Sequence, residues 1–154
     1  MIVDLLRNDL ARVCDDASIT VPELFRLEKY ERVQHLVSVV RGHLRGDCDV
    51  ADLLAATLPG GSITGAPKVR AQEIIAALEP TARGAYCGAM AWFGLADETG
   101  ASAMDSSVLI RTITSARGWL QLPVGGGVVV QSDPEQEYDE TWHKARGMIE
   151  AIHP

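Results

Sequence analysis

The chain has 154 residues, with 14 Lys and Arg against 21 Asp and Glu, for a formal net charge of −7. This length predicts one domain, and an acidic chain without a basic run argues against a nucleic-acid partner. Apolar runs are far shorter than the ~20 residues of a membrane span, and the charged first ten residues are unlike a signal peptide. Cys14, Cys48 and Cys87 are odd in number and widely spaced, which favours reduced thiols in a cytoplasmic protein.

The first third of the chain predicts a helix and a strand. Apolar residues at helical spacing indicate an amphipathic helix over residues 2–14. Residues 15–18 are expected to turn, and residues 21–27, around Pro22, to form one helical turn. Valines within residues 30–44 favour a strand over a helix of that length. This strand carries His35, and a lone histidine among apolar residues is usually structural.

A glycine-rich stretch dominates the middle of the chain. Asp49 is predicted to cap a helix over residues 50–58. Residues 60–68 then read Gly-Gly-Ser-Ile-Thr-Gly-Ala-Pro-Lys, and Pro67 is well placed to open a second helix. Free N–H groups at a helix start can hold an anion. The stretch is not a Walker A loop, because two residues separate Gly65 from Lys68. By spacing alone, an ordinary glycine-rich loop is the simpler interpretation.

Strands dominate the next segment. They are predicted over residues 85–95, 106–115, 119–122 and 128–131, with a hairpin turn at 116–118 and a triple-glycine loop at 125–127. Such short turns require antiparallel pairing. The expected fold class is therefore α+β, a layered antiparallel sheet core with helices packed outside. Arg111 is a single charge in a strand otherwise suited to burial, so it is either a snorkelling edge residue or a fork for a carboxylate.

The last predicted helix carries the second informative pattern. Residues 132–135, Ser-Asp-Pro-Glu, are typical of a capping box, and the helix should run to about Ile152. Its expected buried stripe consists of Tyr138, Trp142, Ala145, Ile149 and Ile152. Glu137, Glu140 and Lys144 lie within about 60° of one another around the helix. Two carboxylates one turn apart can hold Mg²⁺, but the spacing equally describes a solvated face with a Glu140–Lys144 ion pair.

Motifs along the whole chain closely resemble those of the chorismate-utilising enzymes, a family that includes component I of anthranilate synthase and of aminodeoxychorismate synthase. They are Ile2-Val3-Asp4-Leu5 with Arg7-Asn8-Asp9-Leu10, His35-Leu36-Val37-Ser38, Gly60 to Ala71, Ile110-Arg111, Gly125-Gly126-Gly127, and Glu137-Tyr138-Asp139-Glu140-Thr141. The resemblance implies the same α+β fold. It also identifies residues 1–154 as a partial chorismate-binding catalytic domain, the C-terminal part of the usual protein.

The resemblance implies a role for nine residues. Glu137 and Glu140 fall on Mg²⁺ ligands, and the metal binds the ring carboxylate of chorismate. His35 falls on the active-site histidine near the departing ring hydroxyl. The substrate contacts fall on Ser62, Tyr86, Arg111, Gly125, Gly127 and Lys144. Tyr86 and Arg111 hold the enolpyruvyl carboxylate, and Lys144 lies beside the ring carboxylate.

Residues 59–65 and 21–25 are most similar to the aminodeoxychorismate branch. The resemblance therefore implies amination of chorismate to 4-amino-4-deoxychorismate, on the way to para-aminobenzoate and folate, with ammonia from a glutamine amidotransferase subunit. Anthranilate or isochorismate formation on the same scaffold is the enzymatic alternative. A truncated chorismate-binding remnant or subunit is the non-enzymatic one.

Two departures from the family pattern set a further expectation. The family's other metal-ligating glutamates, and its Pro-Ile-Lys-Gly-Thr motif with the nucleophilic lysine, precede the position of Ile2 and are not in this chain. Lys68 is not assumed to substitute for that lysine. We expect the chain alone to hold half a site and to be inactive. Dimerisation is one way of closing the sheet edges left without N-terminal strands.

Overall fold

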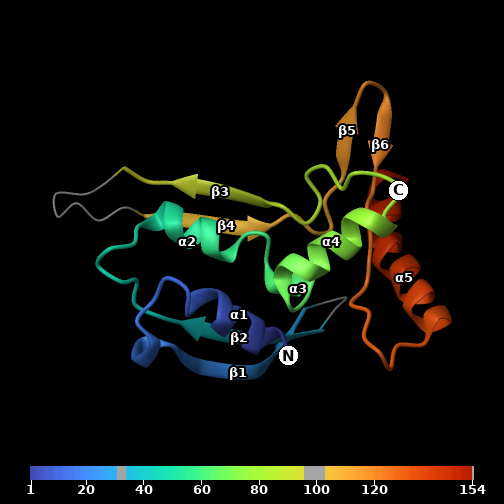
Figure 1. Ribbon diagram of the computed structural model, residues 1–154. Helices are drawn as coiled ribbons and strands as arrows, with labels where there is room; N and C mark the ends of the chain where they lie inside the picture. Colours follow the sequence, from blue (N-terminus) through green and yellow to red (C-terminus); the bar gives the residue numbers. More distant parts are fainter. Residues whose placement is uncertain (31–33, 96–102, 154) are drawn as a thin grey trace. The chain divides into compact units, whose positions relative to one another are not determined.

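The computed structural model describes residues 1–30, 34–95 and 103–153. The chain divides into two compact units: Met1–Leu78 with Gly94–Met104, and Glu79–Phe93 with Asp105–Pro154. The elements, in chain order, are α1 (Ile2–Leu10), the 3₁₀ helix η1 (Asp16–Ser18), β1 (Thr20–Lys29), β2 (Gln34–Arg41), α2 (Val50–Thr57), α3 (Gly61–Thr64), α4 (Lys68–Leu78), β3 (Ala89–Phe93), β4 (Met104–Val108), β5 (Thr114–Ala116), β6 (Trp119–Gln121) and α5 (Pro134–Ile152) (Figure 1). Helices and antiparallel strands confirm the α+β class.

The first unit is built around α1, which packs against α2, α3 and β2 (Figure 1). Its small core consists of the buried side chains of Val13, Cys14 and Ala56, with partly buried apolar side chains around them. The predicted helix over residues 2–14 ends at Leu10. The chain then turns, and Cys14 pairs with Leu44 in an isolated antiparallel bridge.

The predicted cap of α2 is confirmed. The Asp49 carboxylate accepts hydrogen bonds from the backbone N–H groups of Ala51 and Asp52, at 2.8 and 3.0 Å. The Asp52 carboxylate in turn accepts the Asp49 N–H at 2.9 Å, which completes a capping box. The helix expected after Pro67 is also present as α4. Between these helices the glycine stretch forms the short α3, which ends at Thr64. The next residue, Gly65, has a φ of 125°, a conformation that glycine tolerates best.

The first hairpin corrects one prediction and confirms another. Residues 21–27 were expected to form a helical turn, but they belong to β1, which pairs antiparallel with β2 from Thr20 opposite Arg41 to Lys29 opposite Gln34. The pairing shifts register twice, and Phe25 has a φ of 54°. Such bulges let a strand accommodate Pro22 without a missing ladder bond. The strand predicted around His35 is confirmed as β2.

The second unit contains the β5–β6 hairpin, strand β3 and helix α5. The described residues form three two-stranded sheets, β1–β2, β3–β4 and β5–β6. The single strand expected over residues 106–115 is interrupted between β4 and β5, where Arg111 has a φ of 52° that no regular strand contains. The strand expected over residues 128–131 is also wrong. That segment is irregular, and the Ser132 N–H closes a turn onto the Val129 carbonyl at 2.9 Å.

Helix α5 differs from expectation at its start and along its face. Asp133, not Ser132, is its N-cap: the Asp133 carboxylate accepts the N–H groups of Glu135 and Gln136, both at 3.0 Å. Of the expected buried stripe only Ala145 is buried, whereas Tyr138 and Trp142 are 61% and 56% exposed. The described helices include none with the length and apolarity of a membrane span. Cys14, Cys48 and Cys87 are free thiols.

Candidate functional site

Lys144 joins α5 to the triple-glycine loop of the second unit. Its Nζ lies 2.6 Å from Glu140 Oε1 and donates a hydrogen bond to the Gly125 carbonyl at 3.0 Å. The lysine is half-buried, so this contact is shielded from water on one side. The hydrogen bond from Lys144 lowers the pKa of the Glu140 carboxyl. The predicted ion pair is therefore present, and it also holds the loop against the helix.

Glu137 lies one turn before Glu140 and is held differently. Its Oε1 accepts a hydrogen bond from the Ser132 hydroxyl at 2.6 Å. Its Oε2 is buried and has no hydrogen-bond partner among the residues that the structure describes. A Cβ on Gly126 would lie only 2.9 Å from this Oε2, so the loop approaches the carboxylate as closely as it does because residue 126 is glycine. An unpaired buried carboxylate oxygen normally carries a substantial desolvation cost.

A cavity of about 410 Å³ opens beside these carboxylates. It is lined by Val129, Gln131, Ser132, Asp133, Gln136, Glu137 and Glu140. Most of the lining residues come from the segment just before α5, and the first two turns of α5 supply the rest. The positive end of the helix dipole favours negative charge there. The cavity therefore joins three carboxylates, a hydroxyl and the irregular segment after the glycine loop within one unit.

Tyr86 reaches the same glycine loop from the segment before β3. A Cβ on Gly125 would lie 3.1 Å from the Tyr86 hydroxyl, so the phenol packs on the backbone of the loop. Burial, and secondarily the neighbouring Cys87 thiol, raises the pKa of Tyr86. Its hydroxyl thus stays a hydrogen-bond donor across the neutral pH range. Tyr86, Gly125, Lys144 and Glu140 form one connected set.

Two further predicted residues of this unit are exposed. Arg111 stands between β4 and β5 in a left-handed backbone conformation, not within a strand as expected. Its guanidinium is open to solvent, where it can offer its planar fork to a carboxylate. A side chain added at Gly127 would meet nothing within 4 Å, so this glycine leaves open space beside the loop.

In the first unit the glycine stretch is tied to α1 by a buried ion pair. Lys68 Nζ lies 2.7 Å from Asp9 Oδ1 and donates to the Ala56 carbonyl at 3.3 Å. Asp9 Oδ2 accepts the Gly61 N–H at 3.2 Å. The backbone N–H at the start of α3 therefore holds an anion, and that anion is the protein's own Asp9. Lys68 is thus occupied by an ion pair and a hydrogen bond that hold the glycine stretch.

Ser62 and His35 also lie in the first unit. Ser62 follows the anchored Gly61 in α3 and is exposed. His35 lies on β2 opposite Glu28, and its ring meets that of Tyr30 edge-on with centroids 5.6 Å apart. The imidazole is exposed, unlike a satisfied core histidine. Each side chain is therefore available to a ligand.

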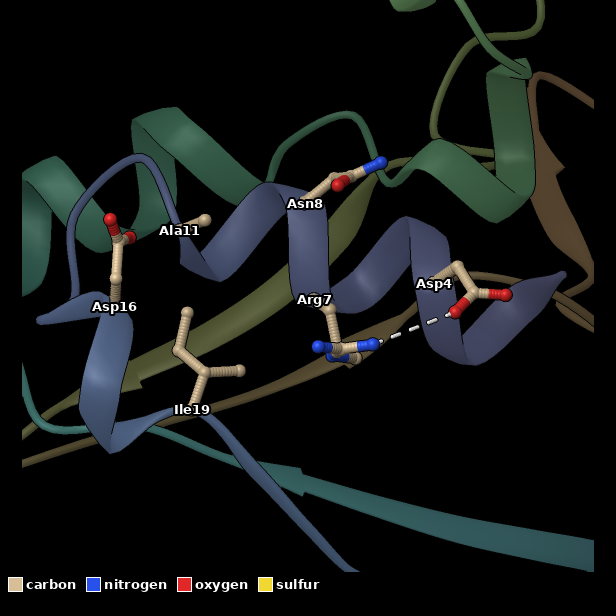
Figure 2. A pocket seen from close by; sticks show the side chains of 6 residues that line it. All are labelled: Asp4, Arg7, Asn8, Ala11, Asp16 and Ile19. Carbon is tan, nitrogen blue, oxygen red and sulfur yellow. Dashed lines mark ion pairs between the residues drawn. The ribbon is translucent and has the colours of Figure 1, made fainter.

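A smaller open cavity runs along α1 in this unit. It has a volume of about 270 Å³ and is lined by Asp4, Arg7, Asn8, Ala11, Asp16 and Ile19. Figure 2 shows the Asp4 and Arg7 side chains pointing toward one another. Arg7 Nη1 and Asp4 Oδ1 form an ion pair at 3.9 Å. The two side chains neutralise each other's charge, and both are exposed to solvent. This cavity contains none of the predicted site residues.

Sequence patterns missed three residues that shape these sites. Asp9 breaks the apolar face of α1, and a charge on such a face could have indicated a buried partner. Ser132 was interpreted as a helix cap, which hid its contact with Glu137. Gly126 was noticed only as one of three glycines. Within the described ranges no three His, Cys, Asp or Glu side chains gather as a metal site.

Comparison with known proteins supports the expected family. The family model for chorismate binding enzymes matches residues 1–150. Aminodeoxychorismate synthase component 1 of Klebsiella aerogenes is 47% identical over 152 residues, which are 99% of this chain and 33% of that protein. Anthranilate synthase component 1 of Streptomyces coelicolor is 43% identical over 152 residues, which are 99% of this chain and 29% of that protein.

A solved structure agrees with the sequence matches. The crystal structure of anthranilate synthase component I from Streptococcus pneumoniae superposes with a TM-score of 0.76 at 38% sequence identity, covering 96% of this chain and 33% of that one. The chain thus spans about a third of the length of the curated relatives it matches. The matched family, the shared fold and the motif order agree, and the chain belongs to the chorismate binding enzyme family.

Proposed function

We propose that this chain is the C-terminal part of an enzyme that aminates chorismate to 4-amino-4-deoxychorismate. The observation that carries the proposal is the contact between α5 and the glycine loop. Lys144 bridges Glu140 and the Gly125 carbonyl, and Glu137 lies beside Gly126. The 47% identity to an aminodeoxychorismate synthase component 1 favours this reaction within the family. Ammonia would come from a glutamine amidotransferase subunit.

The residues at the start of α5 fit a magnesium ion. Glu137 offers a buried carboxylate oxygen without a partner among the described residues, and Gly126 forms a cradle that a Cβ would fill. Glu140 supplies a second carboxylate on the same cavity. Mg²⁺ prefers such oxygen ligands, often takes one or two carboxylates and keeps several waters. When bound, the ion would neutralise a substrate carboxylate and act as a Lewis acid on charge that shifts as the 4-hydroxyl departs.

The other residues of the second unit have roles that follow from their chemistry. Lys144 would place a positive charge beside the ring carboxylate. The Tyr86 hydroxyl would donate a hydrogen bond to the enolpyruvyl carboxylate, since its raised pKa keeps the phenol protonated. Arg111 would bind the same carboxylate through two parallel hydrogen bonds. Gly125 and Gly127 would let the substrate approach the backbone closely.

Two residues of the first unit have proposed roles that follow from their chemistry. His35 would serve as a proton donor to the departing hydroxyl, as an imidazole can. Ser62 would offer a hydroxyl from a loop that the Asp9–Lys68 pair holds in place. Amination replaces the 4-hydroxyl of chorismate by an amino group from ammonia and releases water, so a proton donor at that hydroxyl is what the reaction requires.

Product analysis tests the proposed reaction. The whole parent protein is incubated with chorismate, Mg²⁺ and ammonia, and both amine and pyruvate are measured. We expect chorismate to be converted into an amine without pyruvate, and Glu137→Gln to abolish turnover while Glu150→Gln, on the same helix, does not. Pyruvate released together with anthranilate would overturn the proposal in favour of the second candidate, anthranilate synthase, which the 43% identity to such a protein supports.

The isolated chain is a separate test. We expect the 154-residue chain with Mg²⁺, chorismate and ammonia to yield no aminodeoxychorismate, because it spans only about a third of its relatives. Clear turnover by the chain would contradict this expectation. Saturable, Mg²⁺-dependent binding of chorismate without turnover would support a binding role for the residues named above.

A further inference from the structure

We propose that Ser132 is a positioning residue for the carboxylate of Glu137. The inference deepens the proposed function and rests on it, because that proposal makes Glu137 a metal ligand. Ser132 was expected from the sequence only to cap α5. The structure gives its hydroxyl a different contact, 2.6 Å from Glu137 Oε1.

The hydroxyl is oriented by its own turn. Ser132 donates its backbone N–H to the Val129 carbonyl at 2.9 Å, and its Oγ accepts the Val129 N–H at 3.0 Å. These two bonds fix the serine in the segment between the glycine loop and α5. A serine hydroxyl has one proton and two lone pairs. A lone pair accepts the Val129 N–H, and the proton is donated to Glu137. A bond from a hydroxyl to a carboxylate is charge-assisted and among the stronger kinds.

Helix capping does not account for this contact. Asp133 supplies the N-cap of α5 by accepting the N–H groups of Glu135 and Gln136. The start of the helix is therefore satisfied without Ser132. The hydroxyl of Ser132 acts on a side chain one turn into the helix, and that side chain lines the same cavity.

Gly126 restricts the same carboxylate from the other side. A Cβ there would lie 2.9 Å from Glu137 Oε2, so the backbone of the loop bounds the position of this oxygen. Oε1 is held by Ser132 and Oε2 is left without a partner among the described residues. One oxygen is thus anchored while the other keeps its lone pairs for a cation. Outer partners of this kind orient metal ligands, and their loss typically lowers metal affinity ~10–100-fold.

Titration with Mn²⁺ alone tests the inference on the whole parent protein. The dissociation constant is measured from the electron paramagnetic resonance signal of free Mn²⁺. We expect Ser132→Ala to weaken binding by ~10–100-fold and Ser132→Thr, which keeps the hydroxyl, to restore the wild-type value. Ser18→Ala is the matched control, because Ser18 Oγ likewise donates to an oxygen, Asp15 O at 2.6 Å, and accepts a backbone N–H, that of His43, at 2.8 Å. It should not change affinity.

A second readout separates this inference from the proposed function. The ¹³C chemical shift of the Glu137 carboxyl carbon is measured in metal-free protein. We expect it to change in Ser132→Ala and to return in Ser132→Thr. If Ser132→Ala does not fold, Ser132→Cys, which keeps a similar size with a weak donor, replaces it and should show both effects.

The outcomes are distinguishable. Unchanged Mn²⁺ affinity in Ser132→Ala, with wild-type binding intact, would overturn the inference and leave the proposed function standing. Absence of Mn²⁺ binding by the wild-type parent protein would count against the proposed metal site. In that case the carboxyl shift of Glu137 decides the inference by itself: a change confined to the Ser132 variants without a hydroxyl supports it, and an unchanged shift overturns it.

Discussion

Asp9 is a charged side chain buried to 5% exposure, and its replacement tests how the glycine stretch is held. The carboxylate pairs with Lys68 at 2.7 Å and accepts the Gly61 N–H at 3.2 Å. Asp9→Ala removes both contacts and leaves the lysine charge largely buried, since its side chain is only 19% exposed. Breaking a buried ion pair by removing one partner costs about 3–5 kcal/mol. Because Lys68 keeps its bond to the Ala56 carbonyl, we expect the lower end, about 3 kcal/mol.

A double-mutant cycle separates the pair from its surroundings. Lys68→Met should cost about as much as Asp9→Ala, since it leaves the buried carboxylate with only one hydrogen-bond donor of the two shown here. The double variant should lose less than the sum of the single variants, with a coupling energy of about 1–3 kcal/mol. Asp4→Ala is the matched control on the same helix. Asp4 is 68% exposed, so its loss should change the free energy of unfolding by less than about 0.5 kcal/mol.

The assay is urea-induced unfolding followed by far-UV circular dichroism, together with hydrogen exchange of individual amides. The Gly61 amide should exchange faster in Asp9→Ala, because its hydrogen bond to the carboxylate is lost. The contrary result is that Asp9→Ala unfolds within about 0.5 kcal/mol of the wild type and the Gly61 amide exchanges at the same rate. That result would mean that the ion pair contributes nothing to holding the loop.

Three other predictions concern single contacts. Asp49→Ala should lower the free energy of unfolding by about 1 kcal/mol in urea titrations, because it removes the cap of α2. Glu140→Gln should cost only about 0.3 kcal/mol near neutral pH. Since Lys144 lowers the pKa of Glu140, that contribution is present above pH ~4.3 and is lost as the pH falls through the folded-state pKa, so the two proteins should converge in acid. Gly126→Ala should displace the Glu137 carboxylate and weaken Mn²⁺ binding about tenfold. Unchanged affinity would contradict the idea that the absence of a side chain at residue 126 makes room for this carboxylate.

The sequence by itself determined the N-cap of α2, the ion pair on α5 and the family of the chain. Asp49 was predicted as the N-cap of α2 because an N-cap side chain bonds to backbone N–H groups two or three positions ahead. Glu140 and Lys144 predicted their ion pair because residues four apart on a helix are neighbours. The family motifs identified the chorismate binding family, which the comparison with known proteins confirmed over residues 1–150. Each of these inferences depended on short spacing or on motif order.

Only the tertiary structure decided which distant groups meet. Asp9 and Gly61 are 52 positions apart in the chain, and no local pattern reports their contact. The alternating pattern of residues 106–115 predicted one strand, but the chain is interrupted at Arg111. Pro22 favoured a helical turn over residues 21–27, but these residues pair with β2. In both segments the pairing partners decide whether an extended segment becomes a strand. Trp142 fits an apolar stripe yet is 56% exposed, since burial requires a packing surface that the helix does not itself provide. The hydroxyl of Ser132 likewise acquired its role from the position of Glu137 and Val129 around it, because hydrogen bonds depend on three-dimensional geometry.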